Sequence, residues 1–515
     1  MSAPSAAEFE RLRGLAAVAA DYPVATIPEV FTGRPLTTVP VGTAEDIAAA
    51  FTKARAAQTA WAARPVRERA AIIDRYRRLV SRRREFLMDI AQAETGKSRP
   101  SALEDVIALL LGARYYVEHG PKLLEPKRVP GLIPVVNKTV VRHLPKGVVG
   151  VISPWNYPMA LSIGDAVPAL LAGNAVVVKP DSQTPYCALA LAELLYEAGM
   201  PRDLLAVVPG PGSVVGTALV NECDYLMFTG SAETGARLAE QCGRRLVGIS
   251  AELGGKNPMI VTRTADLATA AKVATRAAFA NSGQLCVSVE RIYVDAAVAE
   301  RFVELFVAET EAMCLGPGYD WAIAMGSLAN PARVDAVEAD VEDAREKGAT
   351  VRTGGRRRPD LGPAFYEPTV LTGVTDEMSV AREETFGPVV SVYPVADAEE
   401  AIARANDSEY GLSASVFAGR TSEAEAIAAR LRSGMVNIGE GYAAAAASLG
   451  APFGGMGRSG LGRRHGPDGL LKYTEPQTIA RQRGVTLDPL PGFTFARWHR
   501  ALAPLVNALG LLPGR

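Results

Sequence analysis

The sequence predicts an α/β protein with two α/β domains and a pair of strands that protrudes between them. Its 515 residues are too many for a single hydrophobic core. From about residue 146 onward, short valine-rich runs alternate with helical patterns, as in sheets whose strands are buried on both faces. Residues 132–144 (LIPVVNKTVVRHL) instead alternate like an exposed strand or hairpin.

Residues 44–120 predict a helical region, because long amphipathic patterns alternate there with short turns. This region includes a basic stretch from Arg67 to Arg84. Ile72, Tyr76 and Val80 recur at helical spacing within it. We therefore interpret the stretch as the solvated face of a helix and expect no nucleic-acid partner. The formal net charge of −1 agrees, since it provides no strong field for a polyanion.

Two series of strands follow the helical region. Apolar runs at 146–153, 175–180, 204–210, 225–230 and 246–253 predict the first sheet. The runs PMIVT, RIYVDA, PVVSVYPV, SASVFAG and GMVNIG, spread over about residues 255–450, predict the second. We expect one domain from residues 1–130 and 145–254 and another from 255–452. Residues 131–144 and 471–485 would form the protruding strands, and 488–515 a C-terminal tail.

The cysteines, the histidines and the N-terminal residues limit which binding sites and which cellular compartment we expect. Five scattered cysteines without a C-x-x-C pair, and four isolated histidines, predict neither a disulfide framework nor a metal site. The N-terminus lacks the apolar core of a secretory signal, and no apolar run has membrane-spanning length. We expect a cytoplasmic protein with free thiols. The tail predicts an amphipathic helix that covers a partner subunit or lines a substrate entrance, with membrane association as the alternative.

Polar residues and glycines gather where the first four predicted strands end, which is where open α/β sheets bind ligands. Glycine loops at several successive strand ends favour a nucleotide, although GPGSVVG does not have the spacing of the G-x-G-x-x-G fingerprint. The residues in these positions are Trp155, Asn156, Lys179, Pro180, Asp181, Ser182, Gly212, Gly216, Gly230 and Ser231.

Cys286 lies in a polar, turn-like stretch, NSGQLCVSVER. A free cysteine is usually a packed core residue, and this stretch alone does not decide between a core cysteine and a nucleophile. As a nucleophile it would need a depressed pKa and N–H donors for an oxyanion, such as the Asn156 side chain and its own backbone N–H. Glu252, in SAELGGKNP, could activate water, or it could be a helix cap or salt-bridge partner.

Seven motifs together resemble the aldehyde dehydrogenase superfamily. SPWNYP, VVVKPDSQTP, FTGSAETG, AELGGKNP, NSGQLCVS, EETFGPV and PFGGMGRSGLGR occur in that family's order over about residues 35–485. Overall likeness, including the tail, is closest to actinobacterial NADP-dependent succinate-semialdehyde dehydrogenases. The resemblance implies a Rossmann-type cofactor-binding domain (1–130 and 145–254), an α/β catalytic domain (255–452) and β oligomerisation strands. It also implies a homodimer or homotetramer.

The resemblance further implies a mechanism and a cofactor site. Cys286 would attack the aldehyde, Asn156 would hold the oxyanion of the thiohemiacetal, and Glu252 would activate the water that hydrolyses the thioester. Lys179 would bind the adenine ribose, Ser231 a phosphate and the Leu253 backbone the nicotinamide amide. Glu384 would hold the nicotinamide ribose, with Phe386 beside the ring.

Cofactor and substrate follow from single positions. Ser182 stands where NAD-dependent relatives often have glutamate, which favours NADP, with NAD possible. By the same resemblance, Ser448 matches a serine of the family that contacts the carboxylate of succinate semialdehyde. Gly164 and Ala280 stand where arginines would be expected. The alternative substrate is an uncharged medium- or long-chain aldehyde. CoA-acylating and non-enzymatic readings are disfavoured because Glu252 and Cys286 are both present.

Overall fold

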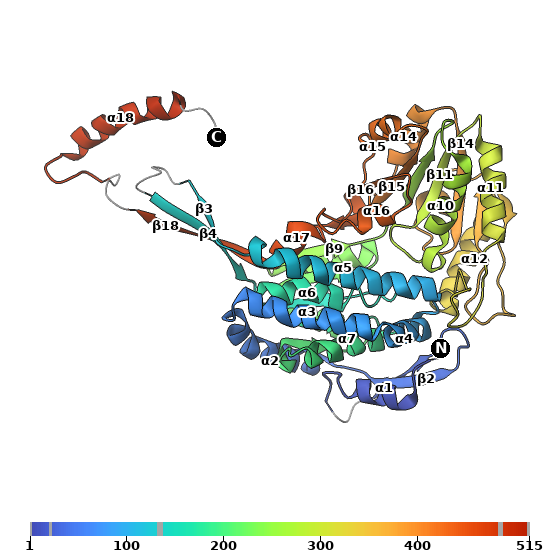
Figure 1. Ribbon diagram of the computed structural model, residues 1–515, viewed down its shortest axis with the longest axis horizontal. Helices are drawn as coiled ribbons and strands as arrows, with labels where there is room; N and C mark the ends of the chain where they lie inside the picture. Colours follow the sequence, from blue (N-terminus) through green and yellow to red (C-terminus); the bar gives the residue numbers. More distant parts are fainter. Residues whose placement is uncertain (1–2, 20–22, 131–136, 483–487, 512–515) are drawn as a thin grey trace. The chain divides into compact units, whose positions relative to one another are not determined.

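The computed structural model describes residues 3–19, 23–130, 137–482 and 488–511. The chain divides into a larger unit, Met1–Leu123 with Pro145–Tyr473, and a smaller unit, Leu124–Leu144 with Thr474–Arg515. The larger unit contains two mainly parallel sheets surrounded by helices (Figure 1). The predicted α/β class is confirmed.

The first sheet has the strand order β17-β9-β8-β5-β6-β7. Five strands are parallel, and β17 alone runs antiparallel, beside β9. The strand order reverses between β5 and β8, so their carboxyl ends flank the crevice where such sheets bind ligands. The strands are β5 (Val148–Ile152), β6 (Ala175–Lys179), β7 (Leu205–Val207), β8 (Tyr225–Thr229), β9 (Gly248–Glu252) and β17 (Gly460–Leu461).

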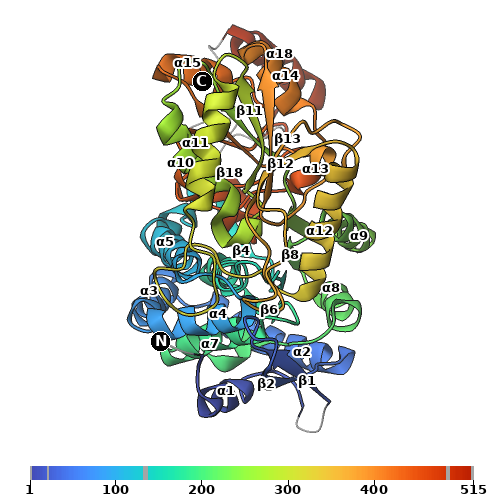
Figure 2. The same cartoon turned by 90° about the vertical axis from the view of Figure 1, so that its right-hand side faces the viewer.

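Helices cover both faces of this sheet. Figure 2 shows α8 and α9 on one side of it and α3, α5 and α7 on the other. The helical region predicted over 44–120 is confirmed as α2 to α5. The helices are α2 (Ala44–Ala62), α3 (Val66–Arg82), α4 (Arg84–Thr95), α5 (Arg99–Leu123), α6 (Ile163–Ala172), α7 (Pro185–Glu197), α8 (Thr217–Glu222) and α9 (Ala232–Arg244).

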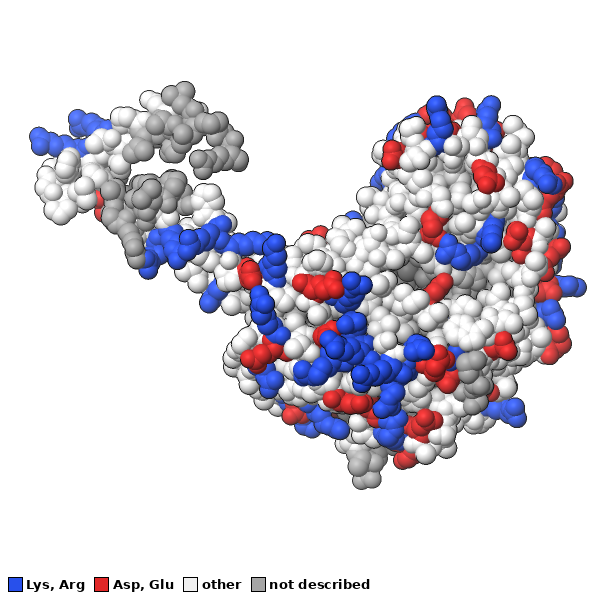
Figure 3. All heavy atoms as spheres, in the orientation of Figure 1, with Lys and Arg blue, Asp and Glu red and all other residues white. Residues whose placement is uncertain are grey.

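Helix α3 shows the predicted separation of apolar and charged faces. Ile72, Tyr76 and Val80 are buried, whereas Arg67 and Arg78 are exposed. Figure 3 shows a group of Lys and Arg side chains over α3, with acidic side chains interspersed. Amphipathic periodicity was therefore sufficient to orient this helix.

The second sheet has the order β12-β13-β14-β11-β10-β15-β16. Helices α10 and α11 lie on one side of it and α12 and α14 on the other (Figure 2). The five predicted runs form β10, β11, β14, β15 and β16, whereas β12 and β13 were not predicted. The elements are β10 (Asn257–Val261), α10 (Leu267–Phe279), β11 (Val289–Asp295), α11 (Ala299–Glu311), α12 (Pro331–Glu346), β12 (Thr350–Thr353), β13 (Thr369–Thr372), α13 (Ser379–Arg382), β14 (Val389–Val395), α14 (Ala398–Asn406), β15 (Ser413–Phe417), α15 (Thr421–Ala428), β16 (Met435–Ile438) and α16 (Ala443–Ala446).

The N-terminal part contains α1 (Ala6–Arg13) and a hairpin of β1 (Val24–Pro28) and β2 (Pro35–Pro40), which the sequence analysis did not predict. Helix α17 (Gly466–Leu471) ends the larger unit. In the smaller unit, β3 (Lys127–Val129), β4 (Asn137–Pro145) and β18 (Thr474–Gln482) form a three-stranded sheet.

The expected strand at 471–485 begins later than predicted, because residue 471 belongs to α17. Residues 131–136 and 483–487 of the expected strands lie outside the described residues. The C-terminal tail contains a helix as predicted, α18 (Phe495–Leu511). No helix among the described residues combines the length and apolar character needed to cross a membrane.

Candidate active site

Cys286 lies in the loop that joins a 3₁₀ turn, Ala280–Gly283, to β11. Asn281 and Ser282 have φ values of 51° and 58°, in the left-handed region that non-glycine residues seldom adopt. The turn is held by buried hydrogen bonds: the Ser282 hydroxyl donates to the carbonyl of Gly326 at 3.0 Å. A Cβ on Gly283 would lie 2.0 Å from the carbonyl oxygen of Gly387. Packing therefore fixes the backbone that presents Cys286.

Asn156 follows β5, at the crevice of the first sheet, and is 4% exposed. Its Nδ2 donates to the carbonyl of Gln284 at 3.1 Å, two residues before Cys286. One of its two amide N–H groups therefore remains for a ligand. Among the described residues, the Cys286 backbone N–H has no acceptor in any other residue and interacts with its own sulfur. The two donors expected to hold an oxyanion thus belong to directly connected segments.

Lys97, which the sequence analysis missed, holds the Asn156 backbone in place. Its side chain is fully buried and its Nζ donates to the Asn156 carbonyl at 2.6 Å. The ammonium also lies 3.8 Å from the carboxylate of Asp105 and 4.2 Å from the ring centroid of Tyr157. A lone lysine after a helix ordinarily indicates solvent exposure, so no sequence signal marked it.

Glu252 is the last residue of β9 and is 3% exposed. Among the described residues, neither of its carboxylate oxygens has a hydrogen-bond partner. In the sheet it pairs with Thr229 of β8 and Gly460 of β17. Burial raises its pKa, and the positive charge of Arg464 opposes that rise. A buried carboxylate with two unoccupied acceptors and a raised pKa is suited to receive a proton from water.

Two glycines after Glu252 bring further groups together. A Cβ on Gly255 would lie 2.6 Å from the Cys286 carbonyl oxygen, and one on Gly254 would lie 2.2 Å from Oε2 of Glu384. The Gly255 N–H donates to Oε1 of Glu384 at 2.8 Å. The close approach explains why these positions are glycine. Cys286, Glu252 and Glu384 also interact electrostatically, so the structure brings together three of the predicted residues.

The expectation of a depressed pKa for Cys286 is wrong in this structure. Burial, together with the negative charges of Glu384 and Glu252, raises the pKa of the thiol to about 12. The positive charge of Arg464 lowers it but does not outweigh these effects. The 3₁₀ turn before Cys286 also leaves it without the helix N-terminus that could stabilise a thiolate.

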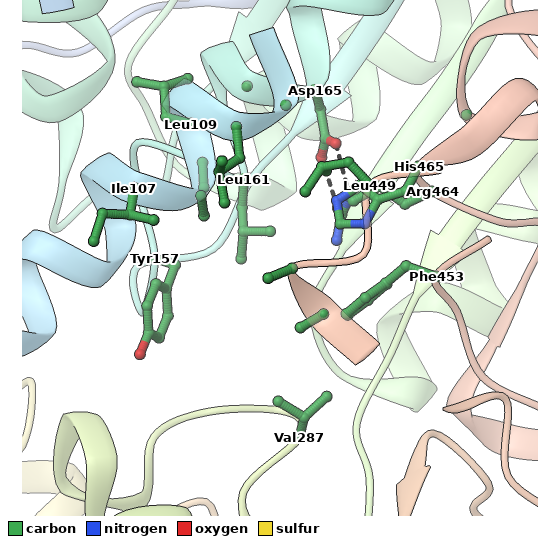
Figure 4. Close-up of a pocket in the computed structure, with 18 of the residues that line it drawn as sticks. Ile107, Leu109, Tyr157, Leu161, Asp165, Val287, Leu449, Phe453, Arg464 and His465 are labelled. Atoms are coloured by element: carbon green, nitrogen blue, oxygen red, sulfur yellow. Dashed lines mark hydrogen bonds and ion pairs between the residues drawn. The ribbon is translucent and has the colours of Figure 1, made fainter. Parts of the chain in front are cut away.

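A cavity of about 370 Å³ opens onto Cys286 and Asn156. Most of its wall is apolar, with Tyr157 and Leu161 on one side of the open space and Phe453 and Arg464 on the other (Figure 4). Gly164 lines the cavity, but Ala280 does not. Ser448 is also absent from the wall: it is exposed, and its hydroxyl donates to the Ala444 carbonyl at 2.8 Å. The structure therefore does not bring Ser448 to the predicted substrate site.

The comparison with known families decides between the enzymatic and the non-enzymatic reading. Residues 20–479 match the aldehyde dehydrogenase family. The chain belongs to the aldehyde dehydrogenase family. It is similar, at 65% identity over the whole of both chains, to a Mycolicibacterium smegmatis protein provisionally named as an NADP-dependent succinate-semialdehyde dehydrogenase.

Two further similarities extend this finding. A Deinococcus radiodurans protein named as an NADP-dependent succinate-semialdehyde dehydrogenase is 37% identical, over 89% of this chain and 95% of the relative. The crystal structure of a Mycobacterium tuberculosis aldehyde dehydrogenase complexed with NAD+ superimposes with a TM-score of 0.86. It is 33% identical and covers 91% of this chain and 96% of that chain.

The residues expected to bind the cofactor of this aldehyde dehydrogenase lie along one edge of the first sheet. Lys179 ends β6, Pro180, Asp181 and Ser182 follow it, Gly212–Gly216 follows β7, and Gly230 and Ser231 follow β8. Ser231 caps α9, accepting from the N–H of Thr234 at 3.3 Å, so the helix N-terminus lies beside it. A Cβ on Gly212 would meet nothing within 4 Å. Glycine loops and a helix N-terminus at this edge are features that phosphate-binding sites use.

Contacts with other residues hold Trp155, Glu384 and Phe386 in place at the end of the expected site where the nicotinamide would bind. The rings of Trp155 and Phe386 meet edge to face, with centroids 5.6 Å apart. Phe386 has a φ of 48°, and its N–H donates to Glu290 at 3.1 Å. Glu290 is in turn paired with Lys256 at 2.5 Å. This buried pair, which sequence reasoning missed, fixes the turn that carries Glu384 and Phe386. The Leu253 N–H is already used, donating to the Ser459 carbonyl at 3.0 Å.

A third buried ion pair was also missed. Arg464 binds Asp165 through two hydrogen bonds, from Nε at 2.8 Å and from Nη2 at 2.7 Å (Figure 4). Nη2 also donates to the hydroxyl of Thr229, the residue beside Glu252 in the sheet, at 3.0 Å. The arginine follows the PFGGMGRSGLGR motif, but nothing in that motif indicates its partner 299 residues away.

Proposed function

We propose that this aldehyde dehydrogenase oxidises succinate semialdehyde to succinate with NADP+. Cys286 and Asn156, which line one cavity, and Glu252, which interacts electrostatically with the Cys286 thiol, carry the proposal. The names of the similar proteins from Mycolicibacterium smegmatis and Deinococcus radiodurans support this substrate and cofactor. When bound, NADP+ would accept the hydride. The net reaction consumes aldehyde, NADP+ and water and yields acid, NADPH and a proton.

The protein's own residues would perform the remaining steps. The Cys286 sulfur would attack the aldehyde carbon, and the thiol proton would pass to the carboxylate of Glu252 and from there to solvent. The free N–H of Asn156 and the Cys286 backbone N–H would stabilise the oxyanion. After hydride loss, Glu252 would take a proton from the water that cleaves the thioester, releasing the acid and the thiol.

Ser182 and Asp181 support NADP+ over NAD+. Ser182 is exposed, and its hydroxyl donates to the Gly210 carbonyl at 3.0 Å. The Asp181 carboxylate accepts from the N–H of Gln183 at 2.9 Å, so it is turned into its own loop. Lys179, the last residue of the strand that precedes this loop, would offset the charge of a 2′-phosphate. NAD+ would fit the same site without these advantages.

A second candidate substrate is an uncharged medium- or long-chain aldehyde. The mostly apolar wall of the cavity and the missing side chain at Gly164 favour it. Measuring kcat/KM for succinate semialdehyde and for uncharged aldehydes of four to ten carbons, without CoA, tests both candidates. A hundredfold preference for an uncharged aldehyde would overturn the proposed substrate. Undiminished activity of Cys286→Ala would overturn the proposed nucleophile.

We also propose a domain arrangement, an assembly and a location. Residues 1–130 and 145–254 would bind the cofactor, and 255–452 would supply the nucleophile. The chain would form a cytoplasmic homodimer or homotetramer through β4 and β18, whose side chains are mostly exposed or half-buried within the isolated unit. Light scattering on the intact chain should give two or four times the 54.3 kDa chain mass. A monomer would exclude this assembly.

A further inference from the structure

The proposed substrate raises a question of charge, because its carboxylate must be desolvated in a mostly apolar cavity. The arginine positions expected from the family are occupied by Gly164 and Ala280. Among the described residues that line the cavity, Arg464 is the only arginine and Lys472 the only lysine. The carboxylate partner must therefore come from one of these two side chains or from neutral donors.

Arg464 has one donor group to spare. Its Nε and Nη2 bind Asp165 and Thr229, but no acceptor for Nη1 is found among the described residues. An Nη1 atom without an acceptor must be either fully buried or accessible to solvent. It is not fully buried, so it reaches open space. Because Arg464 is otherwise buried and lines the cavity, that open space is the cavity. The bidentate pair with Asp165 fixes the plane of the guanidinium in advance, which lowers the entropy cost of binding an anion.

The charges around the cavity differ from wall to wall. Lys472 lines the cavity near Arg464, and its Nζ has a sulfur acceptor, Met227 Sδ, at 3.2 Å. On the other side, Glu104 accepts from the hydroxyls of Tyr157 at 3.1 Å and Tyr442 at 3.2 Å. Figure 4 shows Tyr157 across the open space from Arg464. Asp165, which also lines the cavity, offsets one of the two positive charges beside it, and one of them remains. An anionic end is therefore disfavoured beside Glu104 and favoured beside Arg464 and Lys472.

We propose that Arg464 binds the substrate carboxylate through Nη1, with Lys472 as the second positive charge, and that this residue makes the site selective for semialdehydes that end in a carboxylate. The proposal rests on the proposed function. Asp165 is then a positioning residue, since it acts by holding Arg464. The apolar walls would contact the two methylene groups between the aldehyde and the carboxylate.

The test compares succinate semialdehyde with butanal, which has the same four-carbon chain but no carboxylate. In Arg464→Gln, the ratio of their kcat/KM values should fall about 10- to 100-fold, the effect of losing one hydrogen bond to a charged group. Arg464→Lys keeps a positive charge beside Asp165 and should fold even if the glutamine variant does not. It lacks Nη1, so its ratio should fall as well.

Arg463→Gln is the matched control, because Arg463 is the neighbouring arginine but does not line the cavity. Its ratio should stay within threefold of the wild-type value. An equal loss for both aldehydes in the Arg464 variants would overturn the proposal, because it would mean that Arg464 supports only the fold or Glu252. A wild-type preference for butanal would instead overturn the proposed substrate, whatever the variants do.

Discussion

Gly254→Ala tests whether Glu384 contacts the cofactor. The new Cβ would lie 2.2 Å from Oε2, 2.8 Å from Cδ and 3.0 Å from Oε1 of Glu384, so the carboxylate must move. The 2.8 Å bond from the Gly255 N–H to Oε1 would then break. The displaced carboxylate would also lose its proposed hydrogen bond to the nicotinamide ribose, and such a bond contributes about 1.5–3 kcal/mol to binding. Because each 1.4 kcal/mol corresponds to a factor of ten, we expect the Kd for NADP+ to rise about 10- to 100-fold.

Fluorescence titration with NADP+ measures this effect, and denaturant unfolding checks the fold. The obstacle is the end of a flexible side chain, so the free energy of unfolding should fall by no more than about 3 kcal/mol, the contribution of the broken Gly255–Glu384 hydrogen bond. Gly243→Ala is the control, because its Cβ would meet nothing within 4 Å, and it should leave the Kd unchanged. If Gly254→Ala bound NADP+ within twofold of wild type, Glu384 would have no role in holding the cofactor.

Four further predictions concern Glu252, Lys97 and Ser182. Glu252→Gln should lower steady-state turnover about 10²- to 10⁴-fold yet keep a burst of NADPH of one equivalent per site, and an absent burst would contradict its role after hydride transfer. Burial raises the pKa of Glu252, and Glu252 can act as a base only when it is ionised, so wild-type turnover should rise with pH up to near neutrality. A pH–rate profile that already levels off above an ordinary carboxyl pKa would refute this. Lys97→Met leaves the buried Asp105 without its cation, so urea titrations should show a free energy of unfolding that is lower by about 3–5 kcal/mol. A loss of less than about 1 kcal/mol would mean that the buried pair does not stabilise the fold. Ser182→Glu should lower kcat/KM for NADP+ relative to NAD+ at least tenfold, and an unchanged ratio would remove Ser182 from cofactor selection.

Local patterns in the sequence were enough to predict most regular elements of the two sheets. Valine-rich runs such as 148–152 and 175–179 are buried on both faces, so composition alone distinguishes them from exposed strands. The two-residue strand β17 was missed because its pairing with β9 is set by a chain segment about 200 residues away. Strands β12 and β13 were missed because their short runs carry threonines at the ends and no continuous apolar core.

The sequence by itself determined the nucleophile, the amide donor and the base as candidates, because Cys286, Asn156 and Glu252 lie in polar motifs at predicted strand ends or turns. Only the tertiary structure decided their environment. Lys97 meets Asn156 across 59 residues and Arg464 meets Asp165 across 299. Burial and charge pairing depend on which segments the fold brings into contact, and no local spacing records them. The raised pKa of Cys286 and the position of Ser448 outside the cavity have the same physical origin.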